Sequence, residues 1–214
     1  MRATPDNRIL VWDAPVRVGH WLMVLCFAGA YLTAESERWR LIHVTLGYTM
    51  GGLIVFRLLW GVAGTRYARF TSFVRGPSAV WEYLRTLLGG TPAHYTGHNP
   101  AGAVAIVLLL GAGAIIVTTG WASYNEVGGE WLSALHEGAS NTMLAIVAIH
   151  VAGVVVSSRL HRENLVRSMV TGNKAGARIN AIHSAFWLVA LLLLAAVLGF
   201  WWFQWQGAPV VVPA

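Results

Sequence analysis

The sequence predicts an all-α integral membrane protein, folded as a bundle of transmembrane helices. Two observations on composition predict this class. Of the 214 residues, 56% are hydrophobic and only 11% are charged, whereas an ordinary soluble domain carries about 25% charged residues. The mean hydropathy of the chain is +0.57. The third observation is that the apolar residues are gathered into long runs separated by polar stretches, which is typical of a multi-pass membrane protein.

Five segments approach or reach the length that a membrane helix needs, which is about 20 apolar residues. The first is the shortest, and we expect it to extend by a turn. The third has a clear start, because Asn99 is placed to cap it and Pro100 takes the first helical position. The last ends in tryptophans, which favour the membrane interface. We therefore expect one membrane domain over residues 1–214, with helices at about 18–34, 41–62, 100–122, 141–158 and 179–205.

The charges between these segments predict the orientation of the chain, because Lys and Arg are retained on the cytoplasmic side. One set of polar stretches holds most of them: Arg2, Arg8, Arg17, Arg66, Arg69, Arg75, Arg85, Arg159, Arg162, Arg167, Lys174 and Arg178. The opposite set holds two arginines and five glutamates: Arg38, Arg40, Glu35, Glu37, Glu126, Glu130 and Glu137. We therefore expect a bacterial inner-membrane protein with its N-terminus in the cytoplasm and its C-terminus in the periplasm.

Charge and cysteine content exclude several kinds of function. The net charge of +6 does not indicate a nucleic-acid-binding protein, because the basic residues lie between apolar runs and form no stripe along one helix. Cys26 is the only cysteine. An internal disulfide, a four-cysteine iron–sulfur cluster and the covalent attachment of a c-type haem are therefore excluded.

Ionisable side chains are costly inside a membrane and mark functional sites, so the histidines of the predicted helices are the first candidates. His20 lies near the cytoplasmic start of the first helix, and His43 lies near the outer start of the second. His136 lies at the outer start of the fourth helix, and His150 lies 14 residues further along it. Fourteen helical residues rise about 21 Å and return to within about 40° of the same face. The fourth helix therefore presents one imidazole near each membrane surface.

These depths group the four histidines into an outer pair, His43 with His136, and an inner pair, His20 with His150. Two facing imidazoles are the axial ligands of a low-spin haem iron, and helix bundles are a usual place for such sites. A single membrane histidine more often bonds another helix than binds a metal. Four histidines at two matched depths instead favour two non-covalent haem b groups.

Other residues extend this hypothesis. Gly47 and Gly153 follow their histidines by about one turn and would leave room for a porphyrin on the same face. The haem propionates need cations. Arg57, which lies 14 residues after His43, and Arg17, one turn before His20, are the candidates. In contrast, we expect His94 and His98, in a cytoplasmic loop, to be solvated or bonded locally.

Five stretches of the chain form a recognisable combination: residues 11–21 (VWDAPVRVGHW), 43–47 (HVTLG), 97–102 (GHNPAG), 135–153 (LHEGASNTMLAIVAIHVAG) and 161–174 (HRENLVRSMVTGNK). In these stretches the sequence resembles the prokaryotic dihaem cytochrome b family, which includes cytochrome b561 and the cytochrome b subunits of nickel–iron hydrogenases. The resemblance implies two haem b groups in a four-helix core, with ligands at His20, His43, His136 and His150. The fifth predicted helix, 179–205, departs from the family pattern because it lies beyond that core and carries no obvious ligand.

The leading hypothesis is a dihaem cytochrome b that carries electrons across the inner membrane. They would pass between quinone or quinol and a periplasmic partner, either a c-type cytochrome or a dehydrogenase subunit. One alternative is a stand-alone superoxide:quinone oxidoreductase. An alternative of another class is a non-redox transporter or scaffold, which the lack of Asp or Glu deep in the five helices disfavours. The lipid bilayer is the expected surrounding, and a homo-oligomer is left open.

Overall fold

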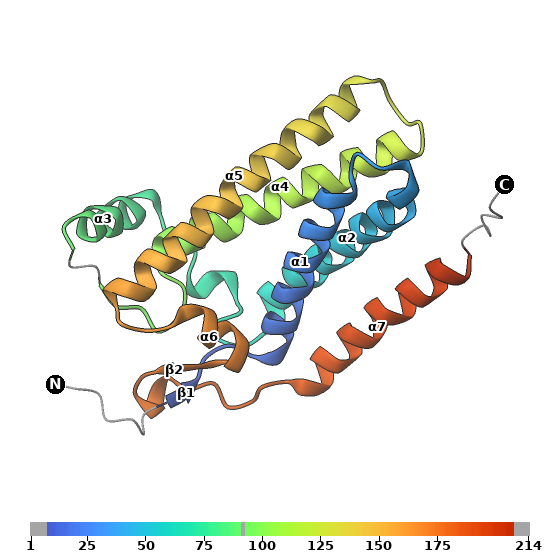
Figure 1. The fold of residues 1–214 in the computed structure, drawn as a ribbon. Helices are drawn as coiled ribbons and strands as arrows, with labels where there is room; N and C mark the ends of the chain where they lie inside the picture. The colour runs from blue at the N-terminus through green and yellow to red at the C-terminus, as the bar shows by residue number, and fades with distance from the viewer. Residues whose placement is uncertain (1–7, 91–92, 208–214) are drawn as a thin grey trace.

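The computed structural model describes residues 8–90 and 93–207. Figure 1 shows long helices with a small two-stranded sheet at one end. The helices and strands are β1 (Arg8–Leu10), α1 (Ala14–Thr33), α2 (Arg40–Ala63), α3 (Pro77–Leu88), α4 (Pro100–Tyr124), α5 (Trp131–Leu160), α6 (Leu165–Thr171), β2 (Asn173–Ala175) and α7 (Trp187–Gln206), with short 3-10 helices at Glu37–Trp39, Phe70–Ser72 and Arg178–Asn180.

Five of these helices, α1, α2, α4, α5 and α7, are long and apolar enough to cross a membrane. This confirms the predicted all-α membrane bundle. The starts of two helices have clear local causes. The Asn99 Oδ1 accepts a hydrogen bond from the Gly102 amide at 2.7 Å, with Pro100 at the first position of α4. The Asp13 Oδ1 accepts from the Val16 amide at 2.8 Å at the start of α1.

Three helix starts differ from the expected bounds. The first helix begins at Ala14 rather than 18, which agrees with the expected extension by a turn. The fourth membrane helix begins at Trp131 rather than 141, because polar residues continue it beyond the apolar run. The fifth begins at Trp187 rather than 179. The segment before it is bonded to the start of the chain instead: the Ile182 amide donates to the Leu10 carbonyl, and the Ala14 amide donates to the Ala185 carbonyl. These contacts hold the backbone out of a helix.

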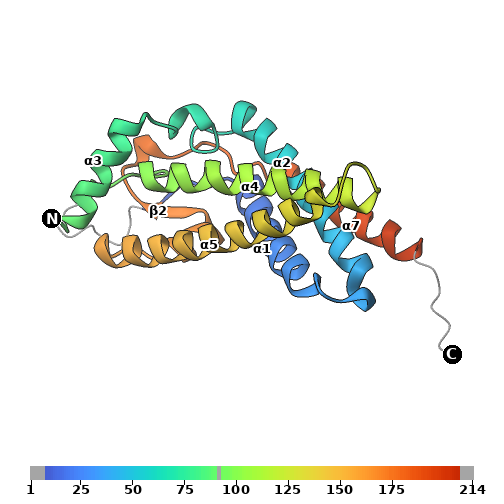
Figure 2. The ribbon, with the colours of Figure 1, turned by 90° about the horizontal axis from the view of Figure 1, so that it is seen from above.

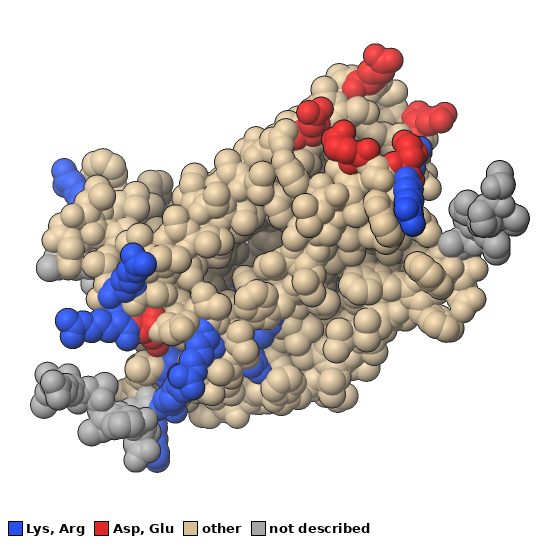
Figure 3. All heavy atoms as spheres, in the orientation of Figure 1, with Lys and Arg blue, Asp and Glu red and all other residues tan. Residues whose placement is uncertain are grey.

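The spanning helices pack as two close pairs. Helix α4 lies along α5, and α1 lies along α2; α2 joins the pairs through α4, and α7 packs on α1. Figures 1 and 2 show α4 and α5 side by side, and Figure 1 shows α7 on the side of α1 away from them. The surface is hollowed between α1 and α5 (Figure 3). The apolar core that holds the bundle together consists of Leu22, Cys26, Met50, Leu53, Ile54, Met143 and Val197.

The small sheet joins the beginning of the chain to the segment after α5. Strands β1 and β2 pair antiparallel, with Ile9 opposite Lys174. The Val11 and Trp12 amides both donate to the Gly172 carbonyl, at 2.9 and 3.0 Å. Basic side chains gather at this end of the molecule, and acidic side chains gather at the opposite end, around the connection between α4 and α5 (Figure 3). The segregation follows the charge pattern of the sequence; Arg2 lies outside the described residues.

Candidate functional site

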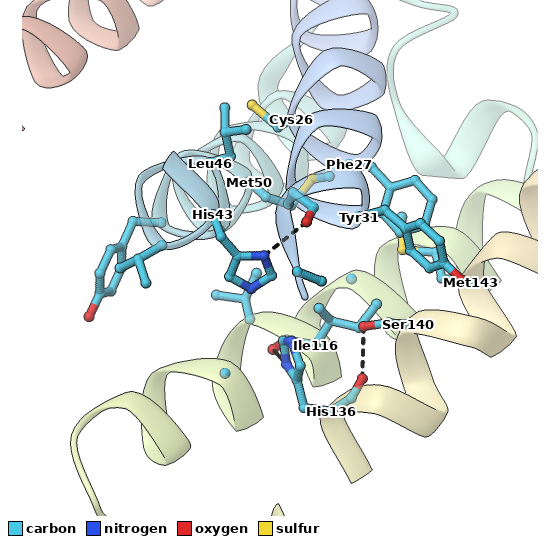
Figure 4. Close-up of a pocket in the computed structure, with 18 of the residues that line it drawn as sticks. Cys26, Phe27, Tyr31, His43, Leu46, Met50, Ile116, His136, Ser140 and Met143 are labelled. Atoms are coloured by element: carbon cyan, nitrogen blue, oxygen red, sulfur yellow. Dashed lines mark hydrogen bonds between the residues drawn. The ribbon is translucent and has the colours of Figure 1, made fainter. Parts of the chain in front are cut away.

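The outer pair of histidines lies in a cavity of about 430 Å³ among α1, α2, α4 and α5. His43 enters it from α2 and His136 enters it from α5, as Figure 4 shows. The centroids of the two imidazole rings are 6.1 Å apart, with an angle of 69° between the ring planes. Bonds of about 2 Å from each imidazole to one metal, together with the size of the two rings, give a centroid separation of about 6 Å. The spacing therefore fits two axial ligands of one metal.

Each ring of the outer pair is held through its Nδ1 by a neighbouring helix. The Nδ1 of His43 lies 2.9 Å from the Ala30 carbonyl oxygen, and the Nδ1 of His136 lies 2.9 Å from that of Ile116. Because a carbonyl oxygen can only accept, the hydrogen sits on Nδ1 in both rings. The Nε2 atoms are then unprotonated and able to bind a metal. Figure 4 shows the His43 ring turning its other nitrogen toward His136.

Two glycines shape this cavity in different ways. A Cβ at Gly120 would lie 2.8 Å from the Cε1 and 3.0 Å from the Nδ1 of His136, so only glycine lets α4 pass this close to the ring. At Gly47, an added Cβ would meet nothing within 4 Å. The space that the sequence predicts beside His43 is therefore present.

The inner histidines lie on α1 and α5, which face each other across the hollow in Figure 3. The Nδ1 of His20 is buried and has no hydrogen-bond partner among the described residues. A Cβ added at Gly153 would meet nothing within 4 Å, so the space predicted beside His150 is also present.

The two arginines predicted near the inner pair are both buried, with 8% of Arg17 and 7% of Arg57 exposed. The Nη1 of Arg17 donates to the Val170 carbonyl at 2.7 Å, and its guanidinium lies 4.9 Å from the centroid of the Trp187 ring. The Arg57 guanidinium lies over Phe70 at 4.8 Å. Arg17 Nε and Arg57 Nη1 are buried without an acceptor in the described part of the chain. Both arginines therefore have a free donor for an anion.

Asp13 is a buried acid that the sequence did not single out. Only 1% of it is exposed. Besides capping α1, it accepts through Oδ2 from Trp60 Nε1 at 3.0 Å and from Thr65 Oγ1 at 2.7 Å. It is close enough to Arg17 and Arg57 to interact with their charges. One carboxylate thus joins the start of α1 to the end of α2. In the sequence, only its position shortly before the stretch RVGH, which contains Arg17 and His20, could have indicated a role for Asp13.

His98 corrects part of an expectation, because its half-buried ring packs between aromatic side chains and its Nδ1 makes no hydrogen bond within the loop. Its ring centroid lies 4.5 Å from those of Trp12 and Phe73, and its Nδ1 is buried without a partner among the described residues. Burial lowers the pKa of His98 to about 3, and Arg57, Lys174, His150 and His20 add to the effect. The ring is therefore neutral and lies near the inner histidines. His94, in contrast, is exposed, and its Nε2 lies 3.6 Å from the Glu163 carboxylate.

The donor set fits haem better than a bare metal ion. Among the described residues, no three His, Cys, Asp or Glu side chains converge as a metal site would require. A porphyrin supplies four in-plane nitrogens and needs only two axial ligands from the protein, which is what the paired histidines offer. The unpartnered guanidinium nitrogens near the inner pair suit its propionates.

The sequence pattern of the family described as prokaryotic cytochrome b561 matches residues 11–172. The chain is also similar to proteins named probable Ni/Fe-hydrogenase B-type cytochrome subunits. The hydrogenase 1 protein of Escherichia coli K12 is 29% identical over 59% of this chain and 65% of its own length, so this chain spans just under two thirds of that relative. The proteins of Azotobacter vinelandii and Rhizobium leguminosarum are 26% and 22% identical, over 78% and 81% of this chain and 88% and 91% of their own lengths.

No solved structure matches the chain significantly. The family match nevertheless covers the whole region from the start of α1 to the end of α6, which includes all four paired histidines. On the strength of that match, this chain is a member of the prokaryotic cytochrome b561 family.

Proposed function

We propose that this protein is a dihaem cytochrome b that carries electrons across the bacterial inner membrane. The observation that carries the proposal is the outer pair: the His43 and His136 rings lie 6.1 Å apart, each with its Nδ1 against a carbonyl oxygen. Two such pairs at opposite depths would hold two haem b groups, His43/His136 on the outer side and His20/His150 on the inner side. Bound haem supplies one-electron redox chemistry at each depth.

The residues of the chain have separate tasks in this proposal. The four histidines bind iron, and the carbonyls of Ala30 and Ile116 fix the orientation of the outer two. Arg17 and Arg57 neutralise propionates on the cytoplasmic side through their free donors. The surrounding apolar core excludes water from the bundle, which is how a protein tunes haem potentials through burial.

We propose quinone or quinol as one redox partner and a dehydrogenase subunit or c-type cytochrome in the periplasm as the other. The names of the similar proteins support a hydrogenase as that dehydrogenase. The acidic end of the molecule supports a basic docking partner there (Figure 3). This end carries Glu126 and Glu130, and the positive-inside pattern supports a periplasmic position for it.

The experiment is a reduced-minus-oxidised absorption spectrum with a haem assay on the detergent-purified protein. The variants are His43→Ala and His150→Ala, with His94→Ala as an exposed-histidine control. We expect two b-type haems per chain in the wild type and in the control, and one in each of the two variants. A wild-type protein without haem, purified from haem-replete cells, would overturn the proposal and favour a non-redox transporter or scaffold.

A further inference from the structure

His98 occupies an unusual place for a histidine between two helices. It precedes the capping residue of α4, yet its ring is enclosed by Trp12, from the start of the chain, and by Phe73, which follows α2. The Nδ1 is buried and has no hydrogen-bond partner among the described residues. A buried polar atom without a hydrogen-bond partner destabilises the folded protein. The atom therefore calls for a partner that the chain itself does not supply.

The surroundings of His98 indicate the charge of that partner. The positive charges of Arg57 and Lys174, and those that His150 and His20 carry when protonated, act on its ring and lower its pKa. Lys174 is already paired, with Glu163 at 3.3 Å and the Tyr95 carbonyl at 3.1 Å. Arg57, in contrast, still has a buried Nη1 without an acceptor in the described chain.

Asp13, a buried acid whose charge acts on Arg57, is already engaged. Both oxygens of Asp13 accept hydrogen bonds, Oδ1 from Val16 and Oδ2 from Trp60 and Thr65. The other acid of this region, Glu163, lies against Lys174 at 3.3 Å, and neither acid supplies an acceptor to His98 Nδ1 or Arg57 Nη1. An anion with carboxylate oxygens would satisfy both.

We propose that His98 is a third propionate-binding residue of the inner haem, donating from Nδ1 to a carboxylate that Arg57 also contacts. The proposal rests on the proposed function, because it requires a haem between His20 and His150. It gives a role to His98 in the stretch GHNP at residues 97–100, whose Asn99 and Pro100 start α4. The role is specific to Nδ1, since that is the buried atom without a partner.

The test uses variants that keep or lose a donor at this atom. The side-chain amide of Asn takes a place near that of histidine Nδ1, whereas the amide of Gln reaches toward the place of Nε2. His98→Asn should therefore preserve the contact, and His98→Gln and His98→Ala should lose it. His94→Ala is the matched control, because His94 lies in the same loop and is exposed.

The readout is the midpoint potential of each haem, measured by spectroelectrochemical titration. The His43→Ala background isolates the inner haem and the His150→Ala background isolates the outer one. Loss of a donor leaves the propionate charge less neutralised, which favours the oxidised iron. We expect His98→Ala to lower the reduced-to-oxidised ratio of the inner haem about tenfold at fixed potential, a shift of about 59 mV, with no change in the outer haem.

The outcomes separate this inference from the proposed function. The role of Nδ1 is supported if His98→Ala lowers the midpoint potential of the inner haem alone. His98→Gln should then show the same lowering, and His98→Asn should restore the wild-type potential. An unchanged inner potential in His98→Ala, equal shifts in both haems, or equal rescue by Gln and Asn would refute it while leaving the dihaem cytochrome intact. If His98→Ala does not fold, the comparison of Asn with Gln still decides. A wild type without haem would refute both.

Discussion

His43 on α2 lies with its Nδ1 2.9 Å from the Ala30 carbonyl oxygen of α1. His136 repeats the arrangement with Ile116, from α5 to α4. In each case the bond joins two helices that pack closely together. The close pairing of helices thus orients each ring, and the wider gap between the two pairs leaves room between the rings. Haem binding therefore depends on the two close helix pairs, α1 with α2 and α4 with α5, and stability depends on the buried charges at the basic end.

The pairing of the histidines predicts how haem losses combine. His20→Ala/His150→Ala should lose one haem, because both residues serve the same iron. His20→Ala/His43→Ala should lose both haems, because each residue serves a different iron. Haem content per chain, measured by the pyridine haemochrome assay, distinguishes these results. Complete loss in the first double variant would contradict the inner pair.

Gly120 lets α4 pass close to the His136 ring, so Gly120→Ala should displace the ring. An added Cβ would lie 2.8 Å from Cε1 of His136, and overpacking of this kind costs about 1–3 kcal/mol. We expect the outer haem to be lost or bound at least tenfold more weakly, with the inner haem retained. Gly111→Ala in the same helix is the control, since its Cβ would meet nothing within 4 Å. Equal haem content in both variants would show that the ring tolerates the methyl group.

Asp13 should be among the most sensitive positions for stability. Asp13→Ala removes a helix cap, leaves the Trp60 and Thr65 donors unpaired, and removes a negative charge near two buried arginines. Leaving a buried charge uncompensated costs about 3–5 kcal/mol. We expect a large fall in the apparent Tm in detergent, followed by circular dichroism.

Two further variants separate the contributions of Asp13. Asp13→Asn keeps the cap but loses the charge, so it should be destabilised less than the alanine variant. Asn99→Ala removes only the cap of α4, which is worth about 1 kcal/mol. An Asp13→Ala variant no less stable than Asn99→Ala would rule out the charge as an important contribution.

Lys174 and Glu163 form an ion pair at 3.3 Å, with only 4% of the Lys174 side chain exposed. Lys174→Met should destabilise the protein by about 3–5 kcal/mol, because it leaves the carboxylate without its cation. Adding Glu163→Gln should recover much of this loss, which a double-mutant cycle of thermal unfolding measures. The exposed Arg40–Glu37 pair is the comparison, and Arg40→Met should change stability little. Additive effects of the Lys174 and Glu163 substitutions would argue against a coupled pair.

The proposed orientation can be checked with cysteine labelling. Cys26 is fully buried, so the wild type should give little background. Thr71 and Glu130 are exposed and lie in connections expected on opposite sides of the membrane. A membrane-impermeant maleimide on intact spheroplasts should label Glu130→Cys and spare Thr71→Cys until the membrane is broken. Labelling of Thr71→Cys but not of Glu130→Cys on intact spheroplasts would show that the orientation is the opposite of the proposed one.

The sequence could supply the helices and the candidate ligands because both depend on local information. Apolar runs of sufficient length identify the spans, and a cap such as Asn99 identifies a start. His20, His43, His136 and His150 are conspicuous because imidazoles are rare in such runs. Their depths follow from the rise per residue alone. Helix boundaries that depend on tertiary contacts could not be predicted from local sequence. The fifth helix starts later than expected because residues 182 and 185 form hydrogen bonds with the start of the chain.

The membrane class, the five spans, the segregation of charge and the family follow from the amino-acid order, because hydropathy and motif spacing are properties of continuous segments. Which polar atoms are buried without partners depends instead on how the helices and loops pack together. His98 lies in a polar loop, and its burial depends on Trp12 and Phe73, which precede it by long stretches of chain. Lys174 is likewise buried by β1 and Tyr95. A loop side chain is buried by segments that come together only when the helices pack, so the local sequence does not predict its burial.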